Sequence, residues 1–145
     1  WRDAKDWGRL FYILLGNLVG VVAIAGILAV SSDATIAKAN EVIANIIADR
    51  TSSDWWRLII RGIGTGFIME MAVCYGREKQ WMTVLLGVPV FIFCGLPHCV
   101  ADIFYYAADC FTQGGSVATY LLPWLCAIVG NLIGCNIPRM LTAEE

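Results

Sequence analysis

A single histidine, His98, lies in an apolar stretch of this 145-residue chain and is the strongest candidate for chemistry. It follows Gly95-Leu96-Pro97 in the sequence GLPHCVAD, residues 95–102. An imidazole can donate a hydrogen bond and can gain or lose a proton near neutral pH. An ionisable group inside a membrane span is costly and usually marks a functional site. We therefore expect His98 to hydrogen-bond or protonate a small ligand.

The cysteines beside His98 raise the alternative of a metal site. Cys94, His98 and Cys99 would form a zinc set that lacks a clear fourth ligand. The six cysteines form no CxxC pair, and five lie in or at the end of apolar runs. We interpret them as small buried hydrophobic residues, and we expect no metal and no cofactor. The apolar runs contain no second histidine for a metal or haem pair, so we do not expect an enzyme.

The composition indicates a membrane protein. The chain is 59% hydrophobic and 15% charged, with a net charge of −2, whereas about a quarter of the residues of a soluble domain are charged. The apolar residues form long runs, as in membrane spans. The slightly negative charge argues against a nucleic-acid partner. We therefore predict an all-α membrane protein that has the lipid bilayer as a partner.

The apolar runs predict four membrane spans in a single transmembrane domain that covers residues 1–145. We place these spans at about 10–30, 55–75, 81–108 and 120–141. Residues 33–50 carry apolar side chains at helical spacing opposite charged ones, which predicts an amphipathic helix at the membrane interface. Three glycines of the first span predict close packing against another helix: Gly16, Gly20 and Gly26.

The third span is too long for one straight crossing, and Gly95-Leu96-Pro97 predicts a break within it. Proline lacks an N–H group and fits the first turn of a helix. We therefore expect one half-helix to end near Cys94 and a second to start near Pro97. The N–H groups and positive dipole end of that second helix would suit a bound anion.

The charged residues give two further expectations. Arg61 and Glu70 lie in the second span about 180° apart, so they cannot pair with each other and each needs a partner elsewhere. The distribution of lysine and arginine predicts that both termini are cytoplasmic.

A repeated motif points to a known family. GNLVG at residues 16–20 recurs as GNLIG at residues 130–134. Together with the broken span, this arrangement resembles the formate/nitrite transporter family. The fifth helix of that family carries a motif near GFEHSxAN, which reads GLPHCVAD here, and its fourth helix opens with Arg-Gly-Ile, as at residues 61–63. The Gly-Asn motifs of the family's third and sixth helices match Gly16-Asn17 and Gly130-Asn131.

The resemblance covers nearly the whole chain, as helices three to six of six. Four spans of a six-span parent would then be present, and the start at Trp1 suggests a fragment. The resemblance implies an aquaporin-like helical bundle that forms a homo-pentamer in the plasma membrane, which is the inner membrane in bacteria. It also implies a channel or transporter for small anions of weak acids, namely formate, nitrite or hydrosulfide.

The same resemblance implies which residues act on the anion. His98 would be the central residue. Phe91 falls at the position of a constriction phenylalanine, and the alternative for this residue is a packed or lipid-facing ring. The implied pore and substrate set is His98, Phe91, Asp102, Asn17, Asn131, Gly95 and Pro97.

Three departures from the family pattern affect this expectation. Pro97 replaces a glutamate, Asp102 replaces an asparagine, and Gly66 stands where some members carry an asparagine. An ionised Asp102 would favour imidazolium but repel an anion, so we expect its side chain to be turned away or hydrogen-bonded to another helix. The alternative function is a non-conducting fragment or a membrane subunit that depends on a partner.

Overall fold

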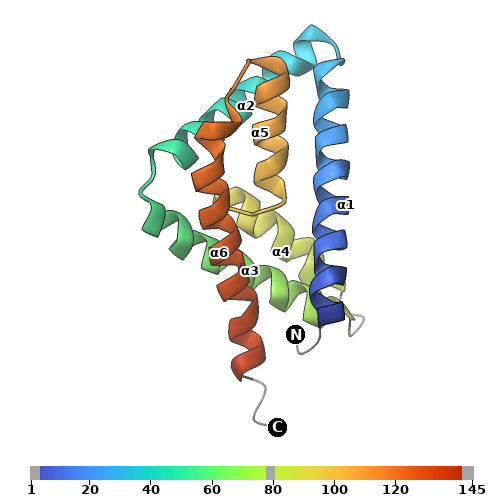
Figure 1. Cartoon of the computed structure of the whole chain (residues 1–145), viewed down its shortest axis with the longest axis vertical. Coiled ribbons are helices and arrows are strands. Elements are labelled where there is room, and N and C mark those ends of the chain that lie inside the picture. Colours follow the sequence, from blue (N-terminus) through green and yellow to red (C-terminus); the bar gives the residue numbers. More distant parts are fainter. Residues whose placement is uncertain (1–3, 78–80, 142–145) are drawn as a thin grey trace. The chain divides into compact units, whose positions relative to one another are not determined.

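The structure is a computed structural model that describes residues 4–77 and 81–141. The described residues contain helices and the turns between them, which confirms the all-α prediction. The six helices are shown in Figure 1 and have these bounds: α1 (Ala4–Ala29), α2 (Asp33–Ser52), α3 (Trp55–Arg77), α4 (Trp81–Phe93), α5 (Ala101–Thr112) and α6 (Val117–Leu141).

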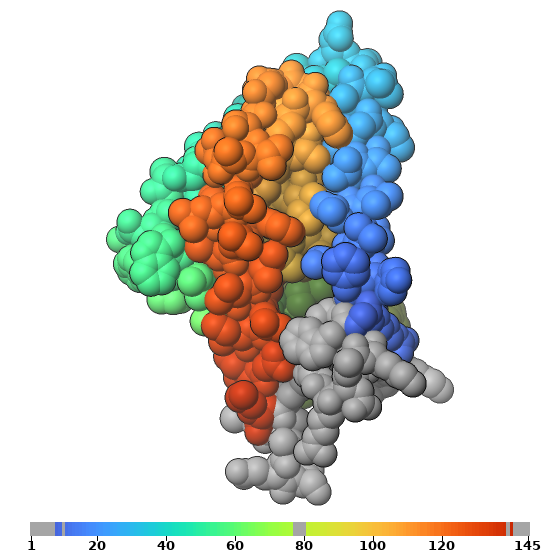
Figure 2. Space-filling model, in the orientation of Figure 1, coloured from blue at the N-terminus to red at the C-terminus, as the bar shows by residue number. Residues whose placement is uncertain are grey.

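Three of these helices are long and apolar enough to cross a membrane. The qualifying stretches are Phe11–Ala29 in α1, Trp55–Gly76 in α3 and Val117–Pro138 in α6, whereas α4 is a shorter apolar helix. Large apolar side chains on the outer faces of α1 and α6 are exposed, and both helices contribute to the surface in Figure 2. An exposed apolar surface of this kind suits a lipid environment.

The contacts divide the chain into two compact units. The first contains residues 1–47 and 100–117, and therefore α1, most of α2 and α5. Its core is formed by Ala25, Ile43 and Ala108, one from each of these helices. The hydroxyl group of Thr112 donates a hydrogen bond to Oδ1 of Asn40 at 2.8 Å and so connects α5 to α2.

The prediction that Gly16, Gly20 and Gly26 pack against another helix is wrong for the described part of the chain. A Cβ atom added at any of the three would meet nothing within 4 Å. The face of α1 that carries these glycines is open, since the helix contacts α5 through other residues such as the buried Ala25.

The second unit contains residues 48–99 and 118–145, and therefore the end of α2, α3, α4, the segment that follows α4, and most of α6. Helices α3 and α4 pack against each other. Helix α6 approaches α3 closely, because a Cβ added at Gly62 would lie 3.2 Å from Cα of Gly130. A Cβ at Gly130 would in turn lie 2.5 Å from the carbonyl oxygen of Ile59. The second copy of the GNLxG repeat is therefore explained by backbone contact between two helices.

The predicted break in the third span is present, but the second half-helix starts later than expected. Helix α4 ends at Phe93, one residue from the prediction, whereas α5 begins at Ala101 rather than at Pro97. The intervening backbone is not helical because its polar groups bond to side chains of α6 instead of to a following turn. Pro97 therefore follows a helix end rather than opening the next helix.

Candidate functional site

The segment that carries His98 begins with a glycine-terminated helix end. The N–H of Leu96 donates to the carbonyl of Phe91 and the N–H of Gly95 donates to that of Ile92, both at 3.0 Å. Gly95 has a φ of 61°. This bonding pattern with a left-handed glycine is the Schellman motif, in which glycine avoids the strain that a Cβ atom would cause. We call residues 94–100, between α4 and α5, the His98 loop.

The backbone of the His98 loop is held by the side chain of Asn131 on α6. Oδ1 of Asn131 accepts the N–H of Cys99 at 2.9 Å, and Nδ2 donates to the carbonyl of Pro97 at 3.0 Å. Nδ2 also donates to the carbonyl of Gly62 on α3 at 3.1 Å. Asn131 is only 9% exposed, so one buried amide joins the loop, α3 and α6.

A second residue of α6 supports the same loop. Nε1 of Trp124 donates to the carbonyl of Cys99 at 2.8 Å. Cys99 therefore has its N–H bonded to Asn131 and its carbonyl bonded to Trp124. A break in a membrane helix requires such partners, because an unpaired backbone group in an apolar medium is costly.

A pair of arginines contacts the first part of the loop. Arg50 and Arg61 both donate to the carbonyl oxygen of Gly95, at 3.0 and 2.6 Å. Asp49 forms ion pairs with both arginines. Burial desolvates the Asp49 carboxylate, but the hydrogen bonds and charges of Arg61 and Arg50 outweigh this effect and lower its pKa. The expectation that Arg61 has a partner outside its own helix is confirmed.

His98 lies against Phe91, the last buried residue of α4. The two rings are stacked, with 5.1 Å between their centroids and 20° between their planes. Phe91 is 5% exposed and His98 is half-buried. The structure therefore brings together two of the residues that the sequence predicted for the site, one near the end of α4 and one on a loop that bonds to α3 and α6.

The other predicted residues occupy different places. Gly95 and the buried Pro97 lie in the His98 loop, and Asn131 supports it. Asp102 belongs to the first unit, in the first turn of α5, and is 1% exposed. Asn17 also belongs to the first unit, where its side chain is exposed on α1.

Some supporting residues were not predicted. Asp49 and Arg50 lie at the end of an amphipathic segment, where charged residues are usually on the surface. Trp124 lies in an apolar run, where a ring usually only packs. The sequence does carry one indication for Trp124. The N–H of a buried tryptophan ring usually requires a hydrogen-bond acceptor, so a Trp in an apolar run suggests that such an acceptor lies nearby. No such rule identifies which carbonyl accepts it.

The prediction that the cysteines are buried is correct for Cys126. It is wrong for Cys74, which is exposed on α3, and for Cys94, which is exposed directly after α4. A Cys at these positions faces outward, and the thiol of Cys74 donates to the carboxylate of Glu70 at 3.4 Å. In the described residues, no three side chains of His, Cys, Asp or Glu come together as metal ligands.

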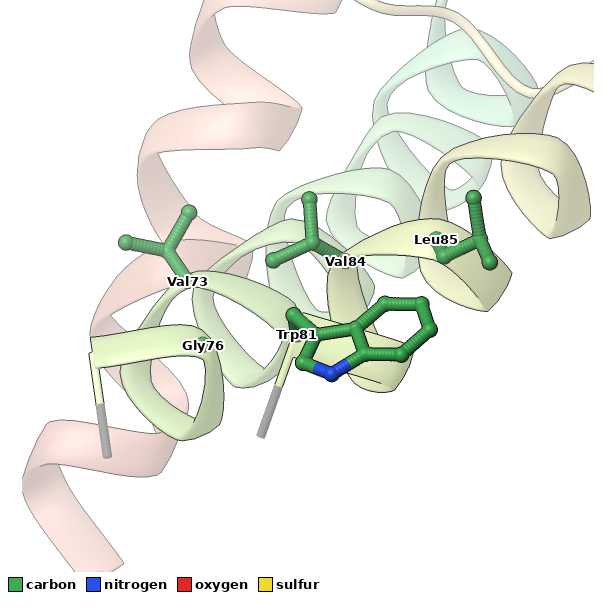
Figure 3. A pocket seen from close by; sticks show the side chains of 5 residues that line it. All are labelled: Val73, Gly76, Trp81, Val84 and Leu85. Atoms are coloured by element: carbon green, nitrogen blue, oxygen red, sulfur yellow. The ribbon is translucent and has the colours of Figure 1, made fainter. Parts of the chain in front are cut away.

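The α3–α4 pair also forms an open groove, shown in Figure 3. Its lining is Val73, Gly76, Trp81, Val84 and Leu85. None of these five described side chains carries a charge.

A comparison with protein families identifies the family of this chain. The sequence model described as formate/nitrite transporter matches residues 5–142. It describes a family of channels and transporters rather than of enzymes. Neither the curated proteins nor the solved structures include a significant match.

Proposed function

Because the chain belongs to the formate/nitrite transporter family, we propose that it carries small monovalent anions of weak acids across a membrane, with His98 as the central residue. Formate, nitrite and hydrosulfide are the candidate substrates. The proposed pathway has the aquaporin-like architecture of the family, and Phe91 contributes to its apolar constriction.

One observation carries this proposal: an imidazole is stacked on a buried aromatic ring at a break between two apolar helices. The loop on which His98 lies has its neighbouring backbone groups bonded to Asn131 and Trp124. These bonds support an imidazole held in a fixed position beside an apolar surface. That arrangement suits a substrate which must leave water before it crosses.

The proposed mechanism uses the two protonation states of His98. An anion that has lost part of its hydration needs a hydrogen-bond donor, and an imidazole N–H provides one. Protonated His98 transfers its proton to the anion, leaving neutral imidazole and the neutral acid. The neutral acid passes the apolar constriction at a far lower desolvation cost than the anion. On the far side the acid releases a proton, and His98 is reprotonated from solvent.

The other residues of the proposed site are proposed to act around His98 rather than on the proton itself. Gly95 and Pro97 shape the His98 loop, and Asn131 holds it. Asp102 is proposed to face away from the anion or to bond to another helix, and Asn17 to contribute from α1. An Asp102→Asn variant with unchanged flux and unchanged pH dependence would exclude a direct part for that carboxylate.

The proposed assembly is a homo-pentamer in the plasma membrane, or inner membrane of a bacterium, with both termini in the cytoplasm. Native mass spectrometry in detergent tests the number of copies. Reporter enzymes fused to each terminus test the orientation. A monomer, or a terminus on the outer side, would contradict the corresponding part of the proposal.

Flux into proteoliposomes tests the function itself. Formate, nitrite and hydrosulfide are offered to vesicles that contain this chain, or a version extended by two upstream spans, with empty vesicles as control. We expect flux for at least one anion, and we expect His98→Asn to reduce it about tenfold or more and to alter its pH dependence. A folded protein that carries none of the three anions in either form would overturn the proposal and favour a partner-dependent membrane subunit.

A further inference from the structure

Arg61 forms a hydrogen bond to the first part of the His98 loop. Its Nη2 donates to the carbonyl oxygen of Gly95 at 2.6 Å. The same guanidinium binds Asp49 through two bonds, from Nη1 to Oδ1 at 3.1 Å and from Nη2 to Oδ2 at 2.8 Å. A planar guanidinium can hold a carboxylate bidentately and keep a further donor for a third group.

The acceptor of this bond is the carbonyl oxygen of Gly95, at the point where the backbone leaves α4. Gly95 is the left-handed residue that ends α4, and its carbonyl orients the chain three residues before His98. A carbonyl oxygen has two lone pairs, and Arg50 and Arg61 each donate to this oxygen. Both donors carry a charge, so these bonds are stronger than neutral ones.

We propose that Arg61 is a positioning residue for transport: held by Asp49, it fixes the Gly95 carbonyl and thereby the place of the His98 imidazole beside Phe91. This inference rests on the proposed function, because it gives Arg61 a part in transport through His98. Arg61 contacts no substrate in this proposal. Asp49 and Arg50 complete the arrangement by orienting Arg61 and by providing the second bond to Gly95.

A purely structural part for Arg61 would give a different pattern. If the residue only joined α2 to α3, then Asp49→Asn and Arg61→Gln would weaken the fold alike and leave His98 unchanged in the molecules that remain folded. Arg61→Lys separates charge from geometry, because lysine keeps the charge but has one nitrogen and cannot span Asp49 and Gly95 in the same way.

The same helix offers a matched control. Arg57 lies one turn before Arg61, its side chain is 61% exposed, and it pairs with Asp54 at 3.4 Å. Arg57→Gln removes the same charge from α3 without removing a bond to the His98 loop. Any effect of Arg61→Gln that exceeds that of Arg57→Gln belongs to the contacts of Arg61.

The first measurement is nuclear magnetic resonance of the imidazole. The chain has one histidine, so protein labelled with nitrogen-15 histidine and carrying a histidine-free purification tag gives signals from His98 alone. We expect Arg61→Gln and Arg61→Lys to shift or broaden these signals, while Arg57→Gln leaves them in place.

The second measurement is the concentration of formate that half-saturates flux into proteoliposomes. We expect Arg61→Gln to raise it about tenfold, the scale of losing one charge-assisted hydrogen bond. Folded Arg61 variants whose His98 signals and half-saturation match those of Arg57→Gln would overturn the proposal. If the wild-type chain carries no anion, the transport function fails, whereas the His98 signals still test whether Arg61 sets the imidazole's position.

Discussion

The phenyl ring of Phe91 and the imidazole of His98 are stacked across the end of α4, with ring centroids 5.1 Å apart. The helix end that separates them is closed by hydrogen bonds to the carbonyls of Phe91 and Ile92. The aromatic residue and the histidine are therefore parts of one local structure, so a change in the ring should alter the environment of the imidazole.

Phe91→Ala should affect both stability and selectivity. The ring is 5% exposed, and truncation of a buried phenylalanine typically costs about 3–5 kcal/mol. Removing it should also widen the proposed constriction, so lactate flux should rise relative to formate flux. The control is Phe93→Ala, two residues along the same helix, where the side chain is 88% exposed. Equal thermal stability and equal selectivity in the two variants would contradict this prediction.

Asn131→Asp should destabilise the protein although it preserves size. The carboxylate can still accept the N–H of Cys99 but cannot donate to the carbonyls of Pro97 and Gly62. Leaving such buried acceptors unpaired costs about 1–3 kcal/mol. Thermal unfolding followed by circular dichroism measures the effect. Asn136→Asp is the control, since Nδ2 of Asn136 donates to the carbonyl of Leu132 one turn earlier on the same helix. The prediction fails if both variants unfold at the same temperature.

Gly66→Ala should disturb the contact between α3 and α6. A Cβ at Gly66 would lie 2.9 Å from Cα of Asn131, and backbone atoms at that distance cannot move aside cheaply. We expect a loss of about 1–3 kcal/mol from overpacking. In Gly64→Ala the new Cβ would meet only Cδ1 of Leu96 at 3.7 Å, an ordinary contact, and the gain in helix propensity should offset part of any loss. An unfolding temperature for Gly66→Ala equal to that of Gly64→Ala would refute the steric explanation.

Acidification should weaken the fold through Asp49. Its pKa is lowered from the ordinary value of 3.8. The ionised carboxylate therefore stabilises the folded state above that ordinary value, and the contribution disappears as the pH falls through the lower folded-state pKa. We expect the unfolding temperature of the wild type to fall on going from about pH 5 to about pH 3, and to fall less in Asp49→Asn. Asp54→Asn, which removes the exposed partner of Arg57, should retain the wild-type fall. Identical pH profiles for Asp49→Asn and the wild type would contradict the prediction.

The sequence was sufficient to predict helices and a break, because both depend on local composition. Apolar runs define the helices, and Gly95 with Pro97 defines the end of α4. The start of α5 was predicted wrongly because Pro97 fits both a first helical turn and the segment after a helix end. Asn131 decides between the two, and it lies 34 positions away from Pro97 in the chain.

The supporting residues of the site could be predicted less well for the same reason. Asn131 was found through a repeated motif, but its three bonds depend on how close α6 comes to α3. Arg61 was recognised as a charge in need of a partner, while the identity of that partner, Asp49, depends on how the chain brings residues 49 and 61 together. The repeated motif also shows that a sequence pattern alone does not predict packing. Its glycines contact the backbone of α3 in the α6 copy, whereas in the α1 copy nothing lies within 4 Å of an added Cβ atom.

The hydrogen bonds between α6 and the His98 loop can form only late in synthesis. Asn131 and Trp124 bond to Pro97 and Cys99 from positions 25 to 34 residues further along the chain. These residues leave the ribosome after the His98 loop, so a nascent chain that has not yet reached α6 contains the loop without Asn131 and Trp124. Because contacts distant in sequence form only when both segments are present, the loop gains these hydrogen bonds only after α6 has been made. A nascent chain that has not yet reached α6 therefore lacks the hydrogen bonds that hold the backbone on both sides of His98.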